Sequence, residues 1–292
     1  PHGLKSGGKI GVENIKMLGE EEFIEALKGA VRESPHDSLL VSVFGYKDNF
    51  EATAIKASYS AYLLDVNTPV VLFDWPGDQP FSVSGYEKAR TMATEAGPFL
   101  GELLSEISRE VKPRRLWVNC SSLGCQVVCD AFERMYEDGD MADSEFEIDH
   151  VVMAAPDVKQ DEFDERFKQE FVALSKKLTA YVASDDMALL ISGMLDGGKR
   201  LGVQKPRKKD PEQLEEAKDL LYLKARHPDK ITLVDVTLID NASYRHGYYL
   251  ESPVFFDDLY LRIFDKEPNV SRRLYLLQTE DKVDYWVLRG SK

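Results

Sequence analysis

LWVNCSSLGCQVVCD, residues 116–130, predicts a strand that turns sharply into a helix. The apolar run Leu116-Trp117-Val118 is typical of the end of a buried strand. From Leu123 onward the apolar residues return at helical spacing, which predicts a helix with one buried side. The turn between the two patterns therefore falls on the small and polar residues around Ser121 and Ser122.

Ser122 is the residue that we place at the apex of this turn. Where a strand and a helix nearly touch, the residues two before and two after the apex must be small. Cys120 and Gly124 satisfy this for Ser122, whereas an apex at Ser121 would put Asn and Leu there. A serine exposed on such a turn forms a nucleophile elbow. This stretch alone leaves an alternative equally open, an ordinary strand–loop–helix joint with a serine cap.

The composition of the chain excludes several classes of protein. With 292 residues, 43% of them hydrophobic, the chain can form one large α/β domain or two small ones, and we expect a single domain over 1–292. The formal net charge of −14 and the lack of a basic stripe argue against a nucleic-acid partner. No apolar run reaches membrane-spanning length, so we expect no transmembrane segment.

The three cysteines and the start of the chain bear on location. Cys120, Cys125 and Cys129 lie within ten residues and suit buried free thiols better than a disulfide. No CxxC pair or nearby histidine accompanies them, so we expect no metal. Free thiols favour a cytoplasmic location. Residues 1–8 do not resemble a signal peptide and look like a processed end, which leaves removal of an upstream export signal as the alternative.

Strands and helices are expected to alternate along the chain with short connections, which predicts a mostly parallel sheet with helices on both faces. A break or kink is expected at Gly97-Pro98, and residues 197–229 are the candidate for a small lid insertion. The expected strands are 9–17, 39–43, 69–73, 116–118, 150–155, 178–182, 231–236 (the last core strand) and a hairpin of 273–277 with 285–288. The expected helices are 20–33, 50–64, 86–111, 162–177, 212–226 and 252–264, with others starting at 123 and 187.

Two polar residues follow expected strands in an order that suits a serine nucleophile. A serine needs a base to take its proton and an acid to orient that base. In open α/β sheets the site lies at the carboxyl ends of the strands. Asp185 and Asp186 follow strand 178–182, and His246 follows strand 231–236. The chain order Ser, Asp, His matches the order expected for a nucleophile elbow.

The choice of base is clearer than the choice of acid. Of the five histidines, only His246 lies both past a core strand and after Ser122. Either Asp185 or Asp186 can be the acid while the other caps the helix starting at 187. Asp157, which follows the strand before them, is the reserve acid.

Acyl transfer also needs two donors for the oxyanion and a pocket for the substrate. One donor is expected to be the backbone N–H of Leu123, and the other to come from the turn at Gly45 or Tyr46, for which a plain turn is the alternative. Several aromatic residues are candidates for an apolar pocket, although ordinary packing is the preferred explanation for at least half of them. These candidates are Phe44, Tyr46, Trp75, Phe81, Tyr86 and Tyr248.

Six motifs taken in order resemble an alpha/beta-hydrolase family of esterase- and lipase-like proteins, known mainly as a domain of unknown function. The resemblance runs from about residue 10 to the C-terminal helix. It implies a serine-hydrolase fold with Ser122 as nucleophile, His246 as base and Asp186, rather than Asp185, as acid. The motifs are Phe44-Gly45-Tyr46, VVLFDWP at 70–76, SSLG at 121–124, AAPD at 154–157, SDDMAL at 184–189 and HGYY at 246–249.

The chain departs from this family at two positions, where the family usually has histidine and this sequence has Phe44 and Ser121. We expect a serine hydrolase that cleaves a carboxylic ester or related acyl bond of a small molecule, without a metal or organic cofactor. The two departures motivate the alternative of a catalytically degenerate hydrolase fold that acts as a binding or scaffold protein. Cysteine chemistry at Cys120 or Cys125 is a third possibility.

Overall fold

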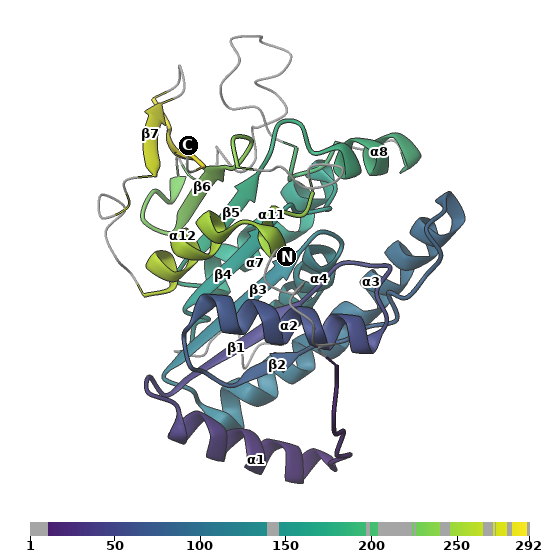
Figure 1. The fold of residues 1–292 in the computed structure, drawn as a ribbon, viewed down its shortest axis with the longest axis vertical. Coiled ribbons are helices and arrows are strands. Elements are labelled where there is room, and N and C mark those ends of the chain that lie inside the picture. The colour runs from purple at the N-terminus through teal and green to yellow at the C-terminus, as the bar shows by residue number, and fades with distance from the viewer. Residues whose placement is uncertain are drawn as a thin grey trace.

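The computed structural model describes residues 11–138, 146–196, 199–203, 224, 226–239, 246–264, 271, 273–278 and 282–290. These residues form one eight-stranded sheet in the order β2-β1-β3-β4-β5-β6-β8-β7 (Figure 1). Among the described strands, neighbours are parallel except for β7 and β8. The strands are β1 Ser38–Val43, β2 Val70–Leu72, β3 Arg115–Ser121, β4 His150–Ala154, β5 Leu178–Val182, β6 Ile231–Asp235, β7 Leu274–Gln278 and β8 Asp284–Leu288.

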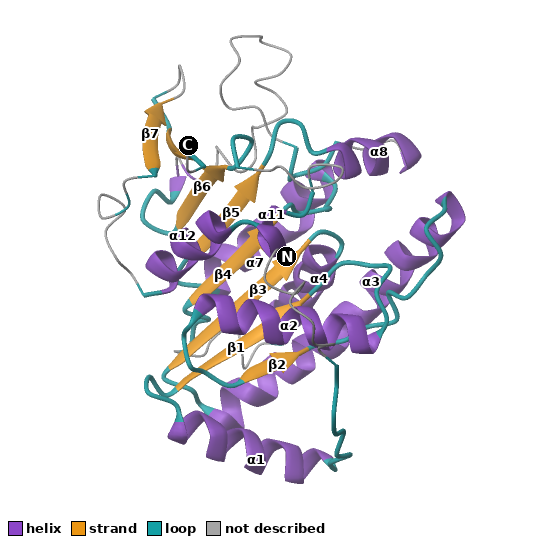
Figure 2. Cartoon of the chain, viewed as in Figure 1, coloured by secondary structure: helices purple, strands orange, loops and turns teal. Residues whose placement is uncertain are grey.

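Helices cover both faces of the sheet (Figure 2). Helices α1, α3, α4 and α7 pack on one face, and α2, α11 and α12 on the other. The helices are α1 Glu20–Glu33, α2 Phe50–Leu64, α3 Val83–Glu106, α4 Gly124–Glu137, α6 Gln160–Glu162, α7 Lys168–Leu174, α8 Met187–Asp196, α11 Tyr248–Glu251 and α12 Pro253–Ile263, with π-helical turns η2 Ile107–Val111 and η3 Phe163–Phe167.

The central strands are buried on both faces, as a parallel sheet between two helical layers requires. In β1, Leu39 and Val41 point into the core beneath α3 and α4, whereas Leu40 points into the core beneath α2 and α12. Strands of this kind appear in the sequence as unbroken apolar runs, which is why their positions could be predicted. The predicted α/β architecture with a mostly parallel sheet is confirmed.

The predicted strand over 9–17 is wrong in its described part. Residues 11–19 have no regular secondary structure, and residues 9 and 10 lie outside the described range. Val12, Ile15 and Met17 are exposed there. An apolar alternation makes a strand only where a neighbouring strand accepts its hydrogen bonds, and none of the described strands pairs with this segment.

Of the expected break or kink at Gly97-Pro98, the break is wrong, because α3 continues through Pro98. Proline removes one backbone hydrogen bond from a helix, and tertiary packing can offset that loss. Gly97 lies directly against α4, where an added Cβ would come within 2.3 Å of the Asp130 Cβ. The close packing of α3 on α4 therefore offsets the cost of Pro98 and keeps the helix continuous through it.

Strand β6 is not the last core strand, contrary to expectation. The C-terminal strand β8 adds to the sheet parallel to β6, with Val234 opposite Trp286. Tyr285 and Val287 are buried, so the second strand of the expected hairpin also belongs to the core. The expected antiparallel pairing of the hairpin is present, with Leu276 opposite Trp286.

Two further expectations concern segments after α4. The helix expected over 162–177 is a composite of α6, η3 and α7. The helix expected over 212–226 and most of the candidate lid at 197–229 lie outside the described residues. Within the described chain, we find no helix of the length and apolarity that a membrane crossing demands.

Candidate active site

Ser122 lies at the carboxyl end of β3 in a left-handed backbone conformation, with φ of 52°. This conformation is uncommon for a residue other than glycine and persists only where the surroundings enforce it. The Ser122 N–H donates to Ala154 O at 3.0 Å, and the Ser122 carbonyl accepts from Asp157 N at 3.1 Å. The end of β4 therefore holds the turn on both sides, and the Ser122 side chain projects from the sheet.

Glycines allow β1 to approach this turn closely. A Cβ on Gly124 would lie 2.5 Å from Val43 O, and a Cβ on Gly45 would lie 2.9 Å from the Ser122 Cβ. The small residue expected after the apex is therefore required by the neighbouring strand β1 rather than by contact between β3 and α4. Cys120, the small residue before the apex, is buried with its Sγ 3.4 Å from Val152 O.

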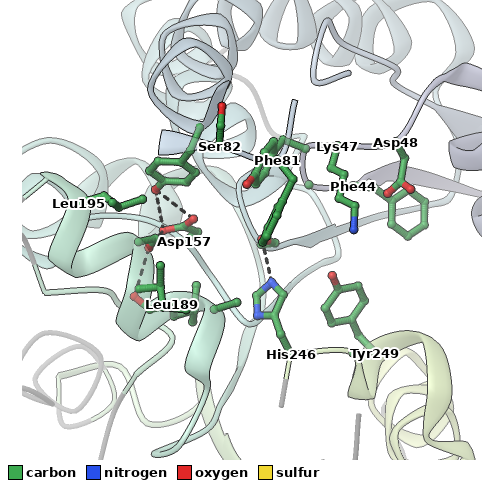
Figure 3. Close-up of a pocket in the computed structure, with 18 of the residues that line it drawn as sticks. Phe44, Lys47, Asp48, Phe81, Ser82, Asp157, Leu189, Leu195, His246 and Tyr249 are labelled. Carbon is green, nitrogen blue, oxygen red and sulfur yellow. Dashed lines mark hydrogen bonds between the residues drawn. The ribbon is translucent and has the colours of Figure 1, made fainter. Parts of the chain in front are cut away.

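The His246 ring lies between Ser122 and Asp186, and Figure 3 shows this ring at the cavity. His246 Nε2 is 2.9 Å from Ser122 Oγ, and His246 Nδ1 is 2.7 Å from Asp186 Oδ2. A carboxylate can only accept, so Nδ1 carries the proton and Nε2 is left to accept from the serine hydroxyl. This is the arrangement in which an imidazole can take the proton of a serine.

The surroundings fix both partners of this line. Asp186 is fully buried, and its second oxygen accepts from Leu189 N in the first turn of α8 at 3.0 Å. The Tyr249 ring packs edge-on against His246, with centroids 5.9 Å apart. The Asp186 carboxylate is thus held at the N-terminus of α8 and the His246 imidazole by an aromatic ring, so the orientation of both side chains is fixed by their surroundings.

The structure distinguishes among the three candidate acids. The Asp186 carboxylate lies within hydrogen-bond distance of His246 Nδ1. The Asp157 carboxylate instead pairs with Arg200 and accepts from Tyr86, so it is engaged in a separate network. Sequence spacing could not separate Asp185 from Asp186, because adjacent side chains point in different directions and the sequence does not show which of them faces the histidine.

Two backbone N–H groups beside the serine are available to an oxyanion. Among the described residues, neither the Leu123 nor the Tyr46 N–H has a hydrogen-bond acceptor. The Gly45 turn lies against the apex, since a Cβ there would be 3.1 Å from Ser122 Oγ and 3.5 Å from Leu123 N. Leu123 also precedes α4, whose N-terminus favours negative charge.

A cavity of about 650 Å³ opens over Ser122 and His246. This volume is within the range of small-molecule sites. Phe44, Gly45 and Tyr46 line the cavity, as do Phe81 and Tyr86. The remaining lining residues are Lys47, Asp48, Lys56, Ser82, Val83, Asp157, Ala188, Leu189, Ile191, Ser192, Leu195, Gly247 and Tyr249.

Trp75 and Tyr248, predicted to bind substrate, lie outside the described lining of this cavity. The buried Trp75 indole donates to Phe44 O at 2.8 Å. The Tyr248 hydroxyl, also buried, donates to Tyr181 O at 2.9 Å and accepts from Ala155 N at 2.7 Å. Both residues stabilise the loops around the site through these hydrogen bonds. The sequence alone could not distinguish this packing role from a binding role.

Helix α8 supplies a wall of the cavity that the sequence analysis missed. Leu189, Ser192 and Leu195 face the cavity. Their spacing of three residues places them on one side of a helix, and this was the signal that could have identified them. They were missed because the interpretation of this segment stopped at the two aspartates that precede it.

The three cysteines are buried free thiols. Burial raises the pKa of the Cys125 and Cys129 thiols well above their usual range. A thiol of raised pKa is a poor nucleophile, because the thiolate is the reactive form. Among the described residues there is no group of three His, Cys, Asp or Glu side chains arranged to hold a metal ion.

Comparisons with known proteins give a family and several structural likenesses. No curated protein matches the chain. An uncharacterized protein from Bacillus cereus is 13% identical over 89% of this chain, with a TM-score of 0.44, and the chain covers 64% of its length. A Pyrococcus furiosus esterase is 13% identical over 78% of this chain and 83% of its own, with a TM-score of 0.41. Carboxyl esterase 2 from Tuber melanosporum is 10% identical over 78% and 76%, with a TM-score of 0.41.

The family model for an alpha/beta hydrolase of unknown function (DUF900) matches residues 19–262. The match spans most of the chain and includes Ser122, Asp186 and His246. The resemblance inferred from the motifs is thereby confirmed at the level of the family. The chain belongs to the alpha/beta hydrolases of this family of unknown function.

Proposed function

We propose that the protein is a serine hydrolase that cleaves a carboxylic ester or a related acyl bond of a small molecule. The observation that carries the proposal is the hydrogen-bonded line from Ser122 through His246 to Asp186 at the cavity. A serine hydroxyl, a neutral imidazole and a buried carboxylate in this order are the parts that acyl transfer needs. The proposed site uses no metal and no organic cofactor.

In the first half of the reaction, Ser122 Oγ attacks the carbonyl carbon of the substrate while its proton passes to His246 Nε2. Asp186 accepts the hydrogen bond from Nδ1 and stabilises the imidazolium. The Leu123 and Tyr46 N–H groups donate to the oxyanion. When the tetrahedral intermediate collapses, the alkoxide leaves with the proton from His246 and the acyl group stays on Ser122.

In the second half, a water molecule attacks the acyl carbon and gives its proton to His246. Collapse of the second tetrahedral intermediate breaks the bond to Ser122 Oγ, which recovers the proton, and the carboxylic acid is released. The left-handed conformation of Ser122 supports this proposal, because backbone strain of this kind is concentrated at functional sites.

A degenerate fold that binds a ligand without cleaving it is the second candidate. It is favoured by Phe44 and Ser121, which stand where the family usually has histidine. Phe44 lines the cavity, and Ser121 is buried directly before the apex. Neither residue belongs to the line formed by Ser122, His246 and Asp186, so the first proposal is the stronger one.

Labelling with a fluorophosphonate probe tests the choice between the two. We expect the wild-type protein to be labelled, Ser122→Ala to lose all labelling, and His246→Ala to lose most of it. Ser121→Ala is the matched control and should keep its label, because it removes only the neighbouring hydroxyl and leaves Ser122 in place. Undiminished labelling of Ser122→Ala refutes the assignment, and an unlabelled wild-type protein favours the binding alternative.

A further inference from the structure

Beside the proposed catalytic line lies a second buried network centred on Asp157. Its carboxylate accepts from the Tyr86 hydroxyl at 3.1 Å and from the Ser192 hydroxyl at 2.8 Å. It also pairs with Arg200, whose Nε lies 2.7 Å from Asp157 Oδ1. The proposed mechanism uses none of these groups, and yet the Asp157 backbone donates to the Ser122 carbonyl.

Arg200 compensates the negative charge of Asp157 in this network. Its side chain is 0% exposed. Nε also donates to Ser192 Oγ at 3.0 Å, and Nη2 donates to the Tyr86 hydroxyl and to Ser192 O, both at 3.3 Å. A buried arginine with a buried aspartate is costly unless further hydrogen bonds surround the pair, as they do here. The arrangement therefore depends on all of its members being in place.

The backbone around Arg200 is joined to the loop that follows β4. Leu201 N donates to Val158 O at 2.9 Å, and Gly202 N donates to Pro156 O at 2.9 Å. The chain thus leaves β5, forms α8, and returns to the sheet beside Asp157. Arg200 reaches from this returning segment to Tyr86 on α3 and Ser192 on α8, so one side chain joins three parts of the fold.

Helix α8 is consequently held at two points. At its start, Leu189 N donates to Asp186, the proposed acid. In its middle, Ser192 is held by Asp157 and Arg200. In Figure 3, Asp157, Leu189 and Leu195 lie on one side of His246, whereas Lys47, Asp48 and Tyr249 lie on the other. The fixed helix therefore forms a wall on one side of the proposed nucleophile.

This wall suits an apolar group. Leu189, Ile191 and Leu195 present hydrocarbon to the cavity. The charge of Asp157 is matched by Arg200, so the wall offers no net charge to a ligand. The lysines that line the cavity, Lys47 and Lys56, come from the loop after β1 and from α2. Each methylene that leaves water for such a wall is worth roughly a fourfold gain in binding.

We propose that Arg200 is a positioning residue that, through Asp157 and Ser192, holds α8 as the wall of an acyl pocket and so sets a preference for esters with uncharged, apolar acyl chains. This rests on the proposed serine-hydrolase function. The acyl chain lies along Leu189, Ile191 and Leu195. An acyl chain that ends in a carboxylate is disfavoured, because the wall has no unmatched positive charge.

Arg200→Met tests the proposal against a matched control, Arg262→Met. Arg262 also pairs in the core with an aspartate, Asp258, at 2.6 Å, and that aspartate also accepts from a tyrosine, Tyr181, at 2.7 Å. The second network includes helix α12, on the face of the sheet that carries α2. Both variants remove a buried arginine from the same kind of cluster, and only one of the two clusters touches the cavity.

The readout is the ratio of kcat/KM for p-nitrophenyl octanoate to that for p-nitrophenyl acetate. We expect Arg200→Met to lower this ratio about tenfold, mainly through a higher KM for octanoate, which corresponds to loss of one to two methylene contacts. Arg262→Met should keep the ratio within about twofold of wild type. A ratio that is unchanged in Arg200→Met, or that falls equally in both variants, overturns the proposal.

Ser192→Ala is the second variant and removes only the hydroxyl that donates to Asp157 and accepts from Arg200, so it tests the link to α8 if Arg200→Met does not fold. We expect it to lower the octanoate-to-acetate ratio in the same direction. A second pair of substrates tests the charge preference. We expect the kcat/KM of the wild-type protein to be at least about tenfold higher for an octanoate ester than for the ester of the corresponding terminal dicarboxylic acid. A preference for the charged ester overturns the proposal.

Calorimetric titration with 1-octanol separates this proposal from the hydrolase proposal, because it requires no turnover. Against a Ser122→Ala background, we expect Arg200→Met to weaken 1-octanol binding by about tenfold. If the wild-type protein hydrolyses no ester and 1-octanol binding still depends on Arg200, the hydrolase proposal fails and the role of the wall stands. If esters are hydrolysed and 1-octanol binding is the same with and without Arg200→Met, the positioning role is wrong.

Discussion

Asp186 contacts His246 with one carboxylate oxygen, at 2.7 Å, and the first turn of α8 with the other, at 3.0 Å. One buried side chain therefore orients the proposed base and begins the helix that walls the cavity. The relationship makes the acid more than an electrostatic partner, because its position depends on the packing of a whole helix.

Asp186→Asn should lower kcat by about 10³- to 10⁴-fold while the protein remains folded. Asparagine preserves the shape of the side chain but can present an N–H₂ group to Nδ1, which favours the wrong tautomer of His246. Asp185→Asn is the matched control and should change kcat by less than about tenfold. Steady-state kinetics on a p-nitrophenyl ester measure both, and the opposite ranking of the two variants would identify Asp185 as the acid.

Gly45→Ala should reduce kcat/KM by about 10²- to 10³-fold, the usual cost of losing one oxyanion donor. The added Cβ would lie 2.9 Å from the Ser122 Cβ and 3.1 Å from its Oγ, so either the serine or the turn that carries Tyr46 N–H must move. Urea unfolding of the variant shows whether the loss arises at the site or from instability.

Gly29→Ala is the control for this substitution. Gly29 lies in α1, and an added Cβ there meets nothing within 4 Å. We expect unchanged kinetics and a gain of about 0.5–1 kcal/mol in the free energy of unfolding, because alanine has the better helix propensity. Full activity in Gly45→Ala would mean that this turn takes no part in the chemistry.

The raised pKa of Asp130 predicts that the stability of the protein depends on pH, independently of catalysis. Burial raises the pKa of this carboxyl to about 6, while Gln126 and Arg166 oppose the shift. The ordinary value is about 3.9, so between pH 4 and 6 the native state binds more protons than the unfolded state. The free energy of unfolding should therefore fall as the pH rises through this window, by at most about 3 kcal/mol.

Asp130→Asn removes the titrating group and should flatten this part of the stability profile. Urea unfolding of both proteins at pH 4, 5, 6 and 7 measures the difference. Arg166 keeps its contacts with Glu133 and Glu162 in the variant. Parallel profiles for the two proteins across the window would show that Asp130 titrates at its ordinary value.

Much of the architecture could be predicted because buried parallel strands appear as apolar runs, as in Leu178–Val182. Polar residues directly after those runs, such as Asp186, fall at the carboxyl edge of the sheet by the same geometry. The position of β8 could not be predicted from its own residues. Tyr285 and Val287 mark a strand, but whether the strand joins the core depends on the free edge of β6.

Within the site, side chains at strand ends were easier to predict than the cavity wall. His246 could be selected because it lies beyond a core strand, whereas Trp75 was assigned to the cavity on residue type alone. Its indole is used to hold the Phe44 carbonyl, a contact between residues 31 positions apart. The Asp157–Arg200 pair was not anticipated for the same reason, since ion pairs between loops leave no periodic signal.

Because α8 begins directly after Asp186 and lines the cavity with Leu189 and Leu195, the fit of a ligand and the proposed proton transfer depend on the same helix. We expect a ligand too broad for the cavity to displace this helix and so to lengthen the contact between the Asp186 carboxylate and the His246 imidazole. Bulky compounds would then be disfavoured both by steric contact with the cavity wall and by a slower proposed proton transfer, even where Ser122 Oγ can still reach them.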